Sequence, residues 1–345
     1  MTHYKRLIAV WILVSGIYAL PATARSDPAP QNGTIMHVKR DTSMPVSPPG
    51  LDAFWKSTLE RLARVPMDAS VENLKEPLPY RELKVTVRSL DGIKITGLLS
   101  LPVAGEDPGR VRRWPVIITT SGYGGKQQGV MLADCMRGFA VLQVFPRGQG
   151  ASAADYTVRG GDKLTMELDH PEGAYYQGAY ADVIRMIDFV TTRKDLDTTR
   201  IAFVATSQGG GIGLCVAALD HRIRTVVAHV PFLCNMPLAA TMPSLVKQLL
   251  DRAGKNNAHS LETLEYFDPY QLAPRLHIPV LMSAGGKDHT CPKQTIESVY
   301  ERIPGKKKLL EYPDLTHTTC LDFYQHIWPW LDRYMDLPVH KHPCG

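Results

Sequence analysis

The sequence predicts an α/β protein, with a mostly parallel sheet covered by helices on both faces and an antiparallel hairpin on its N-terminal side. Short apolar runs alternate with segments of helical periodicity from residue 115 onward. These runs are apolar throughout, which is typical of strands buried on both faces. Before them, two runs of alternating apolar residues flank Asp91-Gly92, a dipeptide that favours a hairpin turn.

The individual elements follow from the local pattern of apolar residues. Residues 51–65 have apolar side chains at helical spacing, so we expect a helix before the hairpin. After the hairpin, apolar runs predict strands at residues 115–122, 139–145, 201–207, 224–230, 278–286 and 307–312. Helical periodicity predicts helices at residues 178–190, 208–220, 295–303 and 321–335, the last of them bent or restarted at Pro329.

The first residues have the pattern of an export signal. Lys5 and Arg6 precede an apolar stretch, and residues 22–24 read Ala-Thr-Ala, a pattern typical of a cleavage site. The apolar stretch at residues 7–20 is shorter than the ~20 residues that cross a bilayer, so we favour cleavage over an uncleaved anchor. The predicted segments are a signal peptide at 1–24, a flexible lead-in at 25–47, one domain at 48–338 and a tail at 339–345. We expect the mature protein in the periplasm or the medium, without membrane attachment.

The composition narrows the classes of partner and cofactor. The 345 residues include 39 basic and 34 acidic ones, a formal charge of +5, and no basic block dominates. This balance argues against nucleic acid as a partner. The six cysteines are widely spaced and include no C-x-x-C pair, which indicates neither a metal site nor a disulfide scaffold. Neither G-x-x-x-x-G-K-[ST] nor G-x-G-x-x-G is present, so we expect no metal and no organic cofactor.

Ser207 ends a predicted strand and is followed by three glycines. A serine at a sharp strand-to-helix turn presents its hydroxyl clear of the backbone, at the carboxyl end of the sheet where ligands bind. Such a turn needs small residues two positions before and after the serine, and Ala205 and Gly209 stand there. The usual pattern is G-x-S-x-G, and this chain has A-x-S-x-G. The alternative is a serine that only caps a helix.

A nucleophilic serine needs a histidine base and a carboxylate that orients it. In enzymes of this type the three follow in the order Ser, Asp, His, each after a later strand. Asp288 follows the predicted strand at 278–286, and His317 follows the one at 307–312. We therefore predict a Ser207, Asp288 and His317 triad. The competing candidates are His289, Asp314, His326, His340 and His342, interpreted as surface, turn, helix or tail residues.

Acyl transfer also needs two N–H donors for the oxyanion. One donor is expected from the residue after the nucleophile, Gln208, and the other from the loop after an early strand. That loop is residues 120–125, whose glycines let the backbone approach a substrate, and Tyr123 is the expected donor.

Several stretches together resemble carbohydrate esterase family seven, the acetyl xylan esterases and cephalosporin-C deacetylases. They are SGYGG at 121–125, RGQG at 147–150, SQGG at 207–210 and VPFLCN at 230–235, with similar segments around the first helix and before Ser207. The resemblance covers residues 48–335. It implies an α/β-hydrolase fold, with Ser207, Asp288 and His317 as triad and with Tyr123 and Gln208 at the positions of the oxyanion donors.

The resemblance also implies an activity and an assembly. The expected reaction is removal of acetyl groups from small acetylated carbohydrates such as xylo-oligosaccharides, and from cephalosporin C, through an acetyl-enzyme. Family members are often hexamers, so a homo-oligomer is expected.

Arg147 and Gln149 are expected to hold the loop architecture rather than touch the substrate, and Arg147 is expected to pair with a carboxylate.

The chain departs from the family pattern at three places. Ala205 replaces a glycine, Thr318 replaces the glutamate after the catalytic histidine, and the loop GGKQQGVMLAD lacks a tryptophan-histidine pair. The last departure concerns the pocket lining and hence the substrate. Cys291 and Cys320 each lie three residues beyond a triad member, and a disulfide between them is one hypothesis, with two separate thiols as its alternative.

Three alternatives to this function remain. The first is a hydrolase of other acyl esters with the same fold. A serine peptidase of related fold would usually carry a large N-terminal gating domain, and residues 25–110 are too few for it. A non-catalytic carbohydrate-binding relative would be expected to lose a triad member or the glycines after Ser207, and this chain has them all.

Overall fold

Residues 47–75, 80–102, 113–125 and 132–336 are described by the structure, a computed structural model. The predicted signal peptide, the lead-in up to residue 46 and the predicted tail lie outside these residues. Within the described part, nine strands form one sheet in the order β1-β2-β3-β5-β4-β6-β7-β8-β9. The strands are β1 (Ser70–Lys75), β2 (Tyr80–Arg88), β3 (Lys94–Pro102), β4 (Trp114–Thr120), β5 (Ala140–Phe145), β6 (Leu196–Thr206), β7 (Ile223–His229), β8 (Val280–Gly285) and β9 (Lys307–Tyr312).

The sheet is parallel from β5 to β9 and antiparallel at its N-terminal side. β4 pairs in parallel with both β5 and β6, and the parallel order continues through β7, β8 and β9. β2 and β3 form the predicted antiparallel hairpin around Asp91-Gly92. The hairpin lies on the N-terminal side of the sheet, as the sequence predicted, but it does not form the edge strand, because the polar strand β1 pairs antiparallel with β2 outside it.

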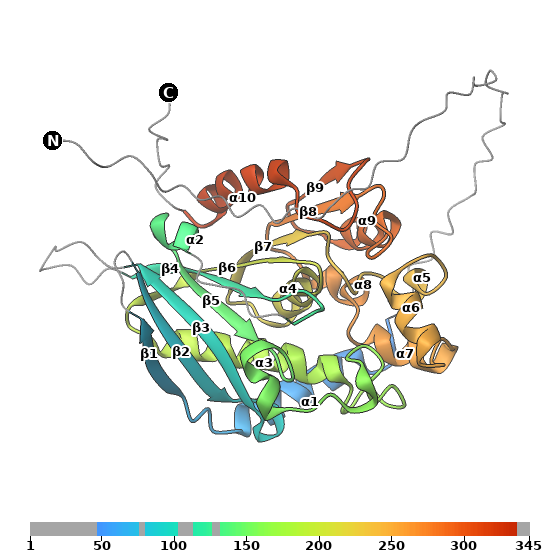
Figure 1. Cartoon of the computed structure of the whole chain (residues 1–345), viewed down its shortest axis with the longest axis horizontal. Helices are drawn as coiled ribbons and strands as arrows, with labels where there is room; N and C mark the ends of the chain where they lie inside the picture. The colour runs from blue at the N-terminus through green and yellow to red at the C-terminus, as the bar shows by residue number, and fades with distance from the viewer. Residues whose placement is uncertain (1–46, 76–79, 103–112, 126–131, 337–345) are drawn as a thin grey trace, which may run out of the picture. The chain divides into compact units, whose positions relative to one another are not determined.

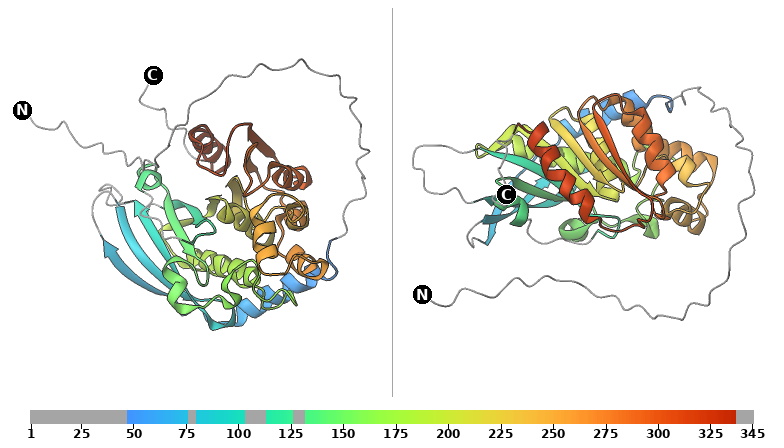
Figure 2. Two further views of the ribbon diagram at one scale, coloured as in Figure 1. Left: turned by 45° about the vertical axis from the view of Figure 1, so that its right-hand side comes forward. Right: turned by 90° about the horizontal axis from the view of Figure 1, so that it is seen from above.

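Helices cover both faces of the sheet. The helices are α1 (Leu51–Arg64), α2 (Leu132–Met136), α3 (Tyr175–Thr192), α4 (Gln208–Leu219), α5 (Met236–Ala239), α6 (Leu245–Arg252), α7 (Ala258–Glu265), α8 (Pro269–Leu272), α9 (Lys293–Arg302) and α10 (Leu321–Tyr334). One buried core joins the sheet to α1, α3, α4 and α9, and a second joins its other face to α2 and α10. Figure 1 shows α3 and α4 on the opposite side of the strands from α10, which lies alongside the strands in the right panel of Figure 2.

α1 is held against the first of these layers by one large aromatic side chain. Trp55 is 1% exposed, and its ring stacks on Tyr180 of α3 with centroids 5.6 Å apart. Its Nε1 donates a hydrogen bond to the carbonyl oxygen of Tyr266 at 2.9 Å. The indole thus buries a large apolar area and satisfies its only polar group. The predicted helix at 51–65 is confirmed.

The sequence predicted a helix bent or restarted at Pro329, and α10 runs through Pro329 as one helix without a restart. Its buried side chains Phe323, Ile327 and Leu331 are spaced four residues apart and pack on the sheet. Pro329 lies on the exposed side, where the carbonyl that its missing N–H would have bonded can meet water. Packing of the buried stripe therefore keeps the helix continuous.

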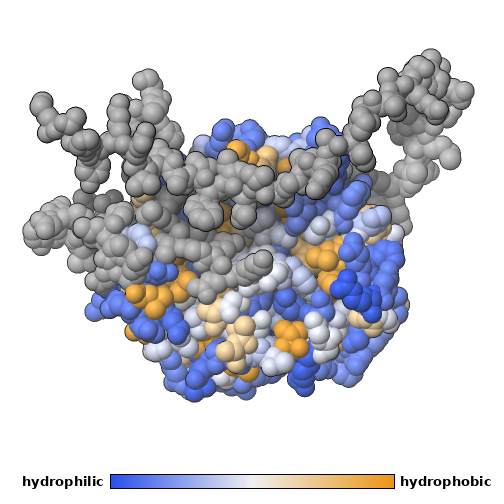
Figure 3. Space-filling model, viewed as in Figure 1, coloured by the Kyte–Doolittle hydropathy of each residue, from blue (hydrophilic) through white to orange (hydrophobic). Residues whose placement is uncertain are grey.

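The connection between β7 and β8 holds the short helices α5 to α8, which the sequence reading left unassigned. Figure 1 shows them together at one end of the sheet. On the face drawn in Figure 3, apolar residues lie in small groups among polar ones. Among the described residues, none of the helices combines the length and the apolar character that a membrane crossing needs.

Candidate active site

Ser207 occupies a strained turn between β6 and α4. Its φ and ψ are 56° and −122°, a conformation that is costly for any residue with a side chain. A Cβ on Gly209 would lie 2.5 Å from the carbonyl oxygen of Thr120, and one on Gly211 would lie 2.1 Å from that of Phe232. The glycines after Ser207 therefore exist because α4 approaches its neighbours closely, as the sequence predicted. The turn is the expected strand-to-helix elbow.

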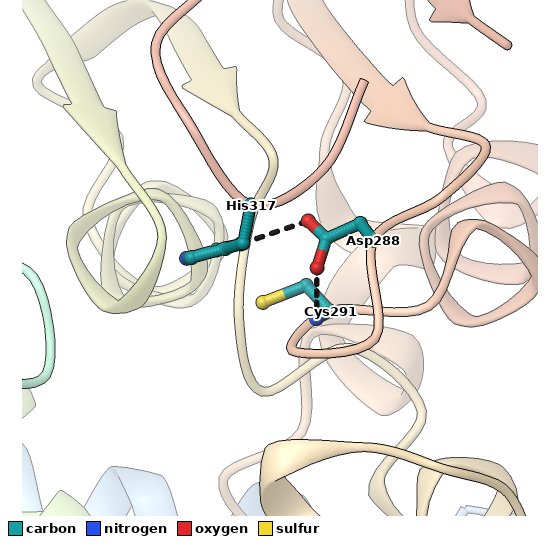
Figure 4. Close-up of side chains that lie close together, drawn as sticks. All are labelled: Asp288, Cys291 and His317. Atoms are coloured by element: carbon teal, nitrogen blue, oxygen red, sulfur yellow. Dashed lines mark hydrogen bonds and ion pairs between the residues drawn. The ribbon is translucent and has the colours of Figure 1, made fainter. Parts of the chain in front are cut away.

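The structure brings the three predicted triad residues together. Ser207 Oγ lies 2.9 Å from His317 Nε2, and His317 Nδ1 lies 2.8 Å from Asp288 Oδ2. Asp288 is 4% exposed, and its Oδ1 accepts hydrogen bonds from the backbone N–H groups of Thr290 and Cys291, both at 2.8 Å. Figure 4 shows Asp288 between His317 and the backbone of Cys291.

This arrangement fixes the tautomer of the histidine. Asp288 Oδ2 accepts the Nδ1–H of His317, because an ionised carboxylate has no hydrogen to give. Nε2 is then left to accept the hydroxyl hydrogen of Ser207. The site can therefore take a proton from the serine and stabilise the resulting imidazolium, which is what nucleophilic acyl transfer requires.

The competing candidates lie apart from this cluster. His289 is exposed, Asp314 forms a surface ion pair with Lys287 at 2.6 Å, and His326 faces Asp322 on α10. His340 and His342 lie outside the described residues. The structure therefore brings only Asp288 and His317, among the candidates it describes, to Ser207.

The two predicted oxyanion donors come from neighbouring loops. Gln208 opens α4, and the first N–H groups of a helix have no partner inside the helix. The side chain of Tyr123 is tied elsewhere: its O–H donates to Asp162 and accepts from the Leu164 N–H at 3.1 Å. Burial and this contact raise the pKa of Tyr123 well above its usual range. Tyr123 is thus anchored by its ring, which leaves its backbone N–H as the group offered to a substrate.

Arg147 and Gln149 hold this loop architecture, as expected. Arg147 pairs with Asp182 at 2.8 Å, and both side chains are at most 5% exposed. Gln149 Oε1 accepts hydrogen bonds from Ser121 Oγ at 3.2 Å and from Gln208 Nε2 at 3.0 Å. One amide therefore joins the loop before Tyr123 to the residue after Ser207.

The structure contradicts the disulfide between Cys291 and Cys320, because both thiols are free. The two side chains turn to different neighbours. The Cys291 thiol is 2% exposed and lies against Ser207, whereas Cys320 lies beside Tyr312. Equal spacing from two triad members in the sequence therefore does not bring the sulfur atoms together.

Ligand atoms of Asp288, Cys291 and His317 lie within 4.8 Å of one another, a spacing that could in principle hold a metal ion. Both oxygens of Asp288 already accept hydrogen bonds, from His317 and from two backbone N–H groups. Burial raises the pKa of the Cys291 thiol well above its usual value, whereas a metal binds the thiolate. The cluster is satisfied as a hydrogen-bonded site and does not suit a metal.

Sequence reasoning missed His229, which ends β7 beside the site. The carbonyl of Thr318 lies 3.1 Å from His229 Nε2 and can only accept, so Nε2 carries the proton and donates to it. In the neutral ring Nδ1 then accepts from Ser283 Oγ at 2.6 Å, while Ser283 Oγ itself accepts from the Val230 N–H at 3.0 Å. Burial lowers the pKa of His229. This neutral imidazole holds the residue that follows His317. A polar residue at the end of an apolar strand was the signal, as at Ser207.

Comparison with known proteins gives one family match and several relatives. A family described as acetyl xylan esterase (AXE1) matches residues 35–334. The acetyl esterase Axe7A of Xylanibacter ruminicola is 26% identical over 313 residues, which span 82% of this chain and 66% of that protein, slightly less than two thirds. Among solved structures, the acetyl xylan esterase from Paenibacillus sp. R4 is 28% identical with a TM-score of 0.76, covering 84% of this chain and 96% of its own. Acetyl xylan esterase 1 from Thermoanaerobacterium sp. JW/SL YS485 also has a TM-score of 0.76, at 23% identity, over 84% of this chain and 94% of its own.

Proposed function

The chain belongs to the acetyl xylan esterase (AXE1) family, and from this premise we propose that it removes acetyl groups from small acetylated carbohydrates, acetylated xylo-oligosaccharides above all. Family membership and the relatives make it a carboxylic ester hydrolase with the α/β-hydrolase fold. The carbohydrate is our proposal, and cephalosporin C is a second substrate of the same acetyl-ester chemistry.

One observation supports the mechanism most strongly: the continuous hydrogen-bonded line from Ser207 through His317 to Asp288, at 2.9 and 2.8 Å. In the proposed reaction Ser207 Oγ attacks the acetyl carbonyl carbon while His317 Nε2 takes its proton. Asp288 stabilises the imidazolium and keeps its Nδ1–H in place. The backbone N–H groups of Tyr123 and Gln208 stabilise the oxyanion of the tetrahedral intermediate.

The same groups complete the reaction. When the tetrahedral intermediate collapses, His317 gives its proton to the departing sugar oxygen, and the acetyl group stays on Ser207 as an ester. Water then attacks this ester, with His317 again as the base, and acetate is released. The chain's own residues supply every proton transfer in this cycle, and no cofactor takes part in it.

The proposal extends to the setting of the enzyme. Export to the periplasm or the medium is supported by the signal pattern at residues 1–24. Assembly into a homo-oligomer, a hexamer above all, is supported by the resemblance to carbohydrate esterase family seven.

The test is acetate release from acetylated xylo-oligosaccharides by the purified mature protein, beside cephalosporin C, 4-nitrophenyl acetate and a peptide amide. Ser207→Ala is the nucleophile control, and Lys287→Ala, which removes an exposed side chain next to Asp288 in the sequence, is the matched control. We expect deacetylation of the sugars that disappears in Ser207→Ala and persists in Lys287→Ala. Cleavage of the peptide amide without the sugars would favour a peptidase, and full activity in Ser207→Ala would contradict the mechanism.

A further inference from the structure

A cavity of about 470 Å³ lies beside Ser207, between the sheet and α10. Cavities of this size are typical of sites that bind small organic molecules. Its lining is mainly apolar and comes mostly from β4, β5, β6, β7 and α10, but it also includes Asp134 of α2 and four threonines. Representative lining residues are Ile117, Val141, Val204, Val227, Phe323 and Ile327.

The cavity reaches the middle of the sheet. Val204 lies on β6, which has paired strands on both sides, so its side chain can be exposed only through the face of the sheet. Val204 and Thr206 are nevertheless partly exposed, while Phe203, which points to the other face, is 0% exposed. Three residues along a strand span about 10 Å. The cavity therefore extends about that far below Ser207, which is enough for several methylene groups.

Two large side chains of α10 near the cavity are exposed. Tyr324 lines the cavity and is 39% exposed, and Leu321, one turn earlier and not itself part of the lining, is 82% exposed. The polar ring of His229 on the cavity wall has both nitrogens engaged, by Ser283 and by the Thr318 carbonyl. An alkyl chain that lies along the apolar part of the lining would gain about fourfold in binding for each methylene it buries.

The position of the catalytic groups decides which half of an ester enters. Ser207 and Gly122 line the cavity, but His317 does not. Gly122 directly precedes the proposed oxyanion donor Tyr123, so the acyl carbon bonded to Ser207 lies next to the opening. The alcohol departs with the proton of His317 and thus on the side away from the cavity. The cavity is placed for the acyl group and not for the alcohol.

We propose that this cavity is an acyl-binding pocket, which lets the enzyme cleave esters of linear acyl groups of about four to eight carbons in addition to acetyl esters. The inference rests on the proposed function, because it needs Ser207 as the nucleophile. It adds a class of substrate: carbohydrates or other small alcohols that carry a medium-length fatty acyl group.

The test compares kcat/KM for the 4-nitrophenyl esters of acetate, butanoate and hexanoate. In the wild type we expect kcat/KM to rise from acetate to hexanoate by about tenfold or more. Val204→Phe fills the cavity from the sheet, and we expect it to lower the hexanoate-to-acetate ratio about tenfold. Val71→Phe makes the same chemical change on the exposed edge strand β1, and we expect it to leave the ratio unchanged.

Ile327→Phe fills the same cavity from α10, and it decides the question if Val204→Phe fails to fold. The rates at which hexyl and methyl 4-nitrophenyl phosphonates inactivate the wild type give an independent comparison, with the hexyl compound expected to react faster. A steady fall of kcat/KM from acetate to hexanoate, or an unchanged ratio in a folded filled variant, would overturn the pocket. If these results occur while acetylated sugars are cleaved through Ser207, only the pocket is wrong; full ester hydrolysis by Ser207→Ala would instead overturn the proposed function.

Discussion

Gln208 Nε2 donates a hydrogen bond of 3.0 Å to Gln149 Oε1, and this contact joins the two loops that form the proposed oxyanion site. Gln149 Nε2 in turn donates to Tyr175 Oη at 2.6 Å, and the Tyr175 hydroxyl donates to the Arg147 carbonyl at 2.9 Å. All of these side chains are buried. A chain of buried hydrogen bonds between amide and hydroxyl groups therefore positions the two proposed oxyanion donors.

Replacing Gln149 should weaken the transition state more than substrate binding. Gln149→Ala leaves Ser121 and Gln208 without their shared acceptor, so the N–H groups of the proposed oxyanion site lose their fixed spacing. Loss of a direct donor costs ~10²–10³ in turnover, and we expect about tenfold for this indirect effect, in kcat rather than KM.

The control for this prediction is Tyr176→Phe. It removes only the 3.2 Å hydrogen bond from Tyr176 to Gln208 Oε1 and leaves the shared acceptor in place. Steady-state kinetics on 4-nitrophenyl acetate measure both variants. An unchanged kcat in folded Gln149→Ala would show that Gln149 does not position the donors.

The buried pair of Arg147 and Asp182 should be needed for stability. Asp182 is 0% exposed and also accepts from the Arg147 backbone N–H at 2.8 Å. Arg147→Met would leave a buried carboxylate without its charge partner, which typically costs about 3–5 kcal/mol in the free energy of unfolding. Urea denaturation measures this loss. The double variant Arg147→Met, Asp182→Leu should recover part of it, and a double variant as unstable as the single one would contradict this account.

Because α4 packs closely against neighbouring backbone, we expect substitution of two glycines by alanine to have different effects on thermal stability. In Gly211→Ala the new methyl group would lie 2.1 Å from the carbonyl oxygen of Phe232, so α4 must shift, and overpacking of this kind costs about 1–3 kcal/mol. A Cβ at Gly124 meets no atom within 4 Å. Thermal unfolding should therefore show a lower Tm for Gly211→Ala and little change for Gly124→Ala. Equal Tm values for the two variants would argue against the tight elbow.

His229 predicts a dependence of stability on pH. Burial lowers the pKa of His229 in the folded protein, whereas the same histidine in the unfolded chain keeps its ordinary pKa of about 6.5. Below about pH 6.5 the unfolded chain therefore binds a proton at this residue more readily than the folded protein does. The stabilisation by neutral His229 is thus present above about pH 6.5 and is lost as the pH falls through the lowered folded value. His229→Gln does not titrate there.

Urea unfolding of the wild type and of His229→Gln at pH 7.5 and at pH 5 tests this. The wild type should exceed the variant in stability at pH 7.5, and the difference should shrink at pH 5. His221→Gln at an exposed position is the matched control and should show no such trend. A difference that is the same at both pH values would contradict the neutral buried imidazole.

The sequence was sufficient to predict the parallel strands and the proximity of Ser207, Asp288 and His317, for one physical reason. Strands buried on both faces must be apolar throughout, so each one is visible as a run, and a polar residue just after it must lie at the carboxyl edge of the sheet. The same reasoning could have identified His229, but a histidine within an apolar run is equally consistent with a buried core residue.

Other features could not be read in this way. β1 is polar and pairs with a neighbouring strand on one side only, so its sequence lacks the pattern of apolar residues that identifies a buried strand. The helices α5 and α8 are four residues long, too short for a period to show, and they begin at the capping side chains of Asn235 and Asp268. The disulfide hypothesis failed because sequence spacing does not say where a side chain points. The cavity beside Ser207 depends on packing between β6 and α10, which are far apart in the chain.

The central claim is that Ser207 is the nucleophile of an ester hydrolase, and covalent labelling tests it most directly. The protein would be treated with one equivalent of diethyl 4-nitrophenyl phosphate, which forms a stable ester with an activated serine, and the label located by peptide mass spectrometry. We predict one diethylphosphoryl group per chain, on Ser207, with esterase activity lost in proportion to labelling. A label on another residue that abolishes activity, or full activity in protein labelled at Ser207, would contradict the account.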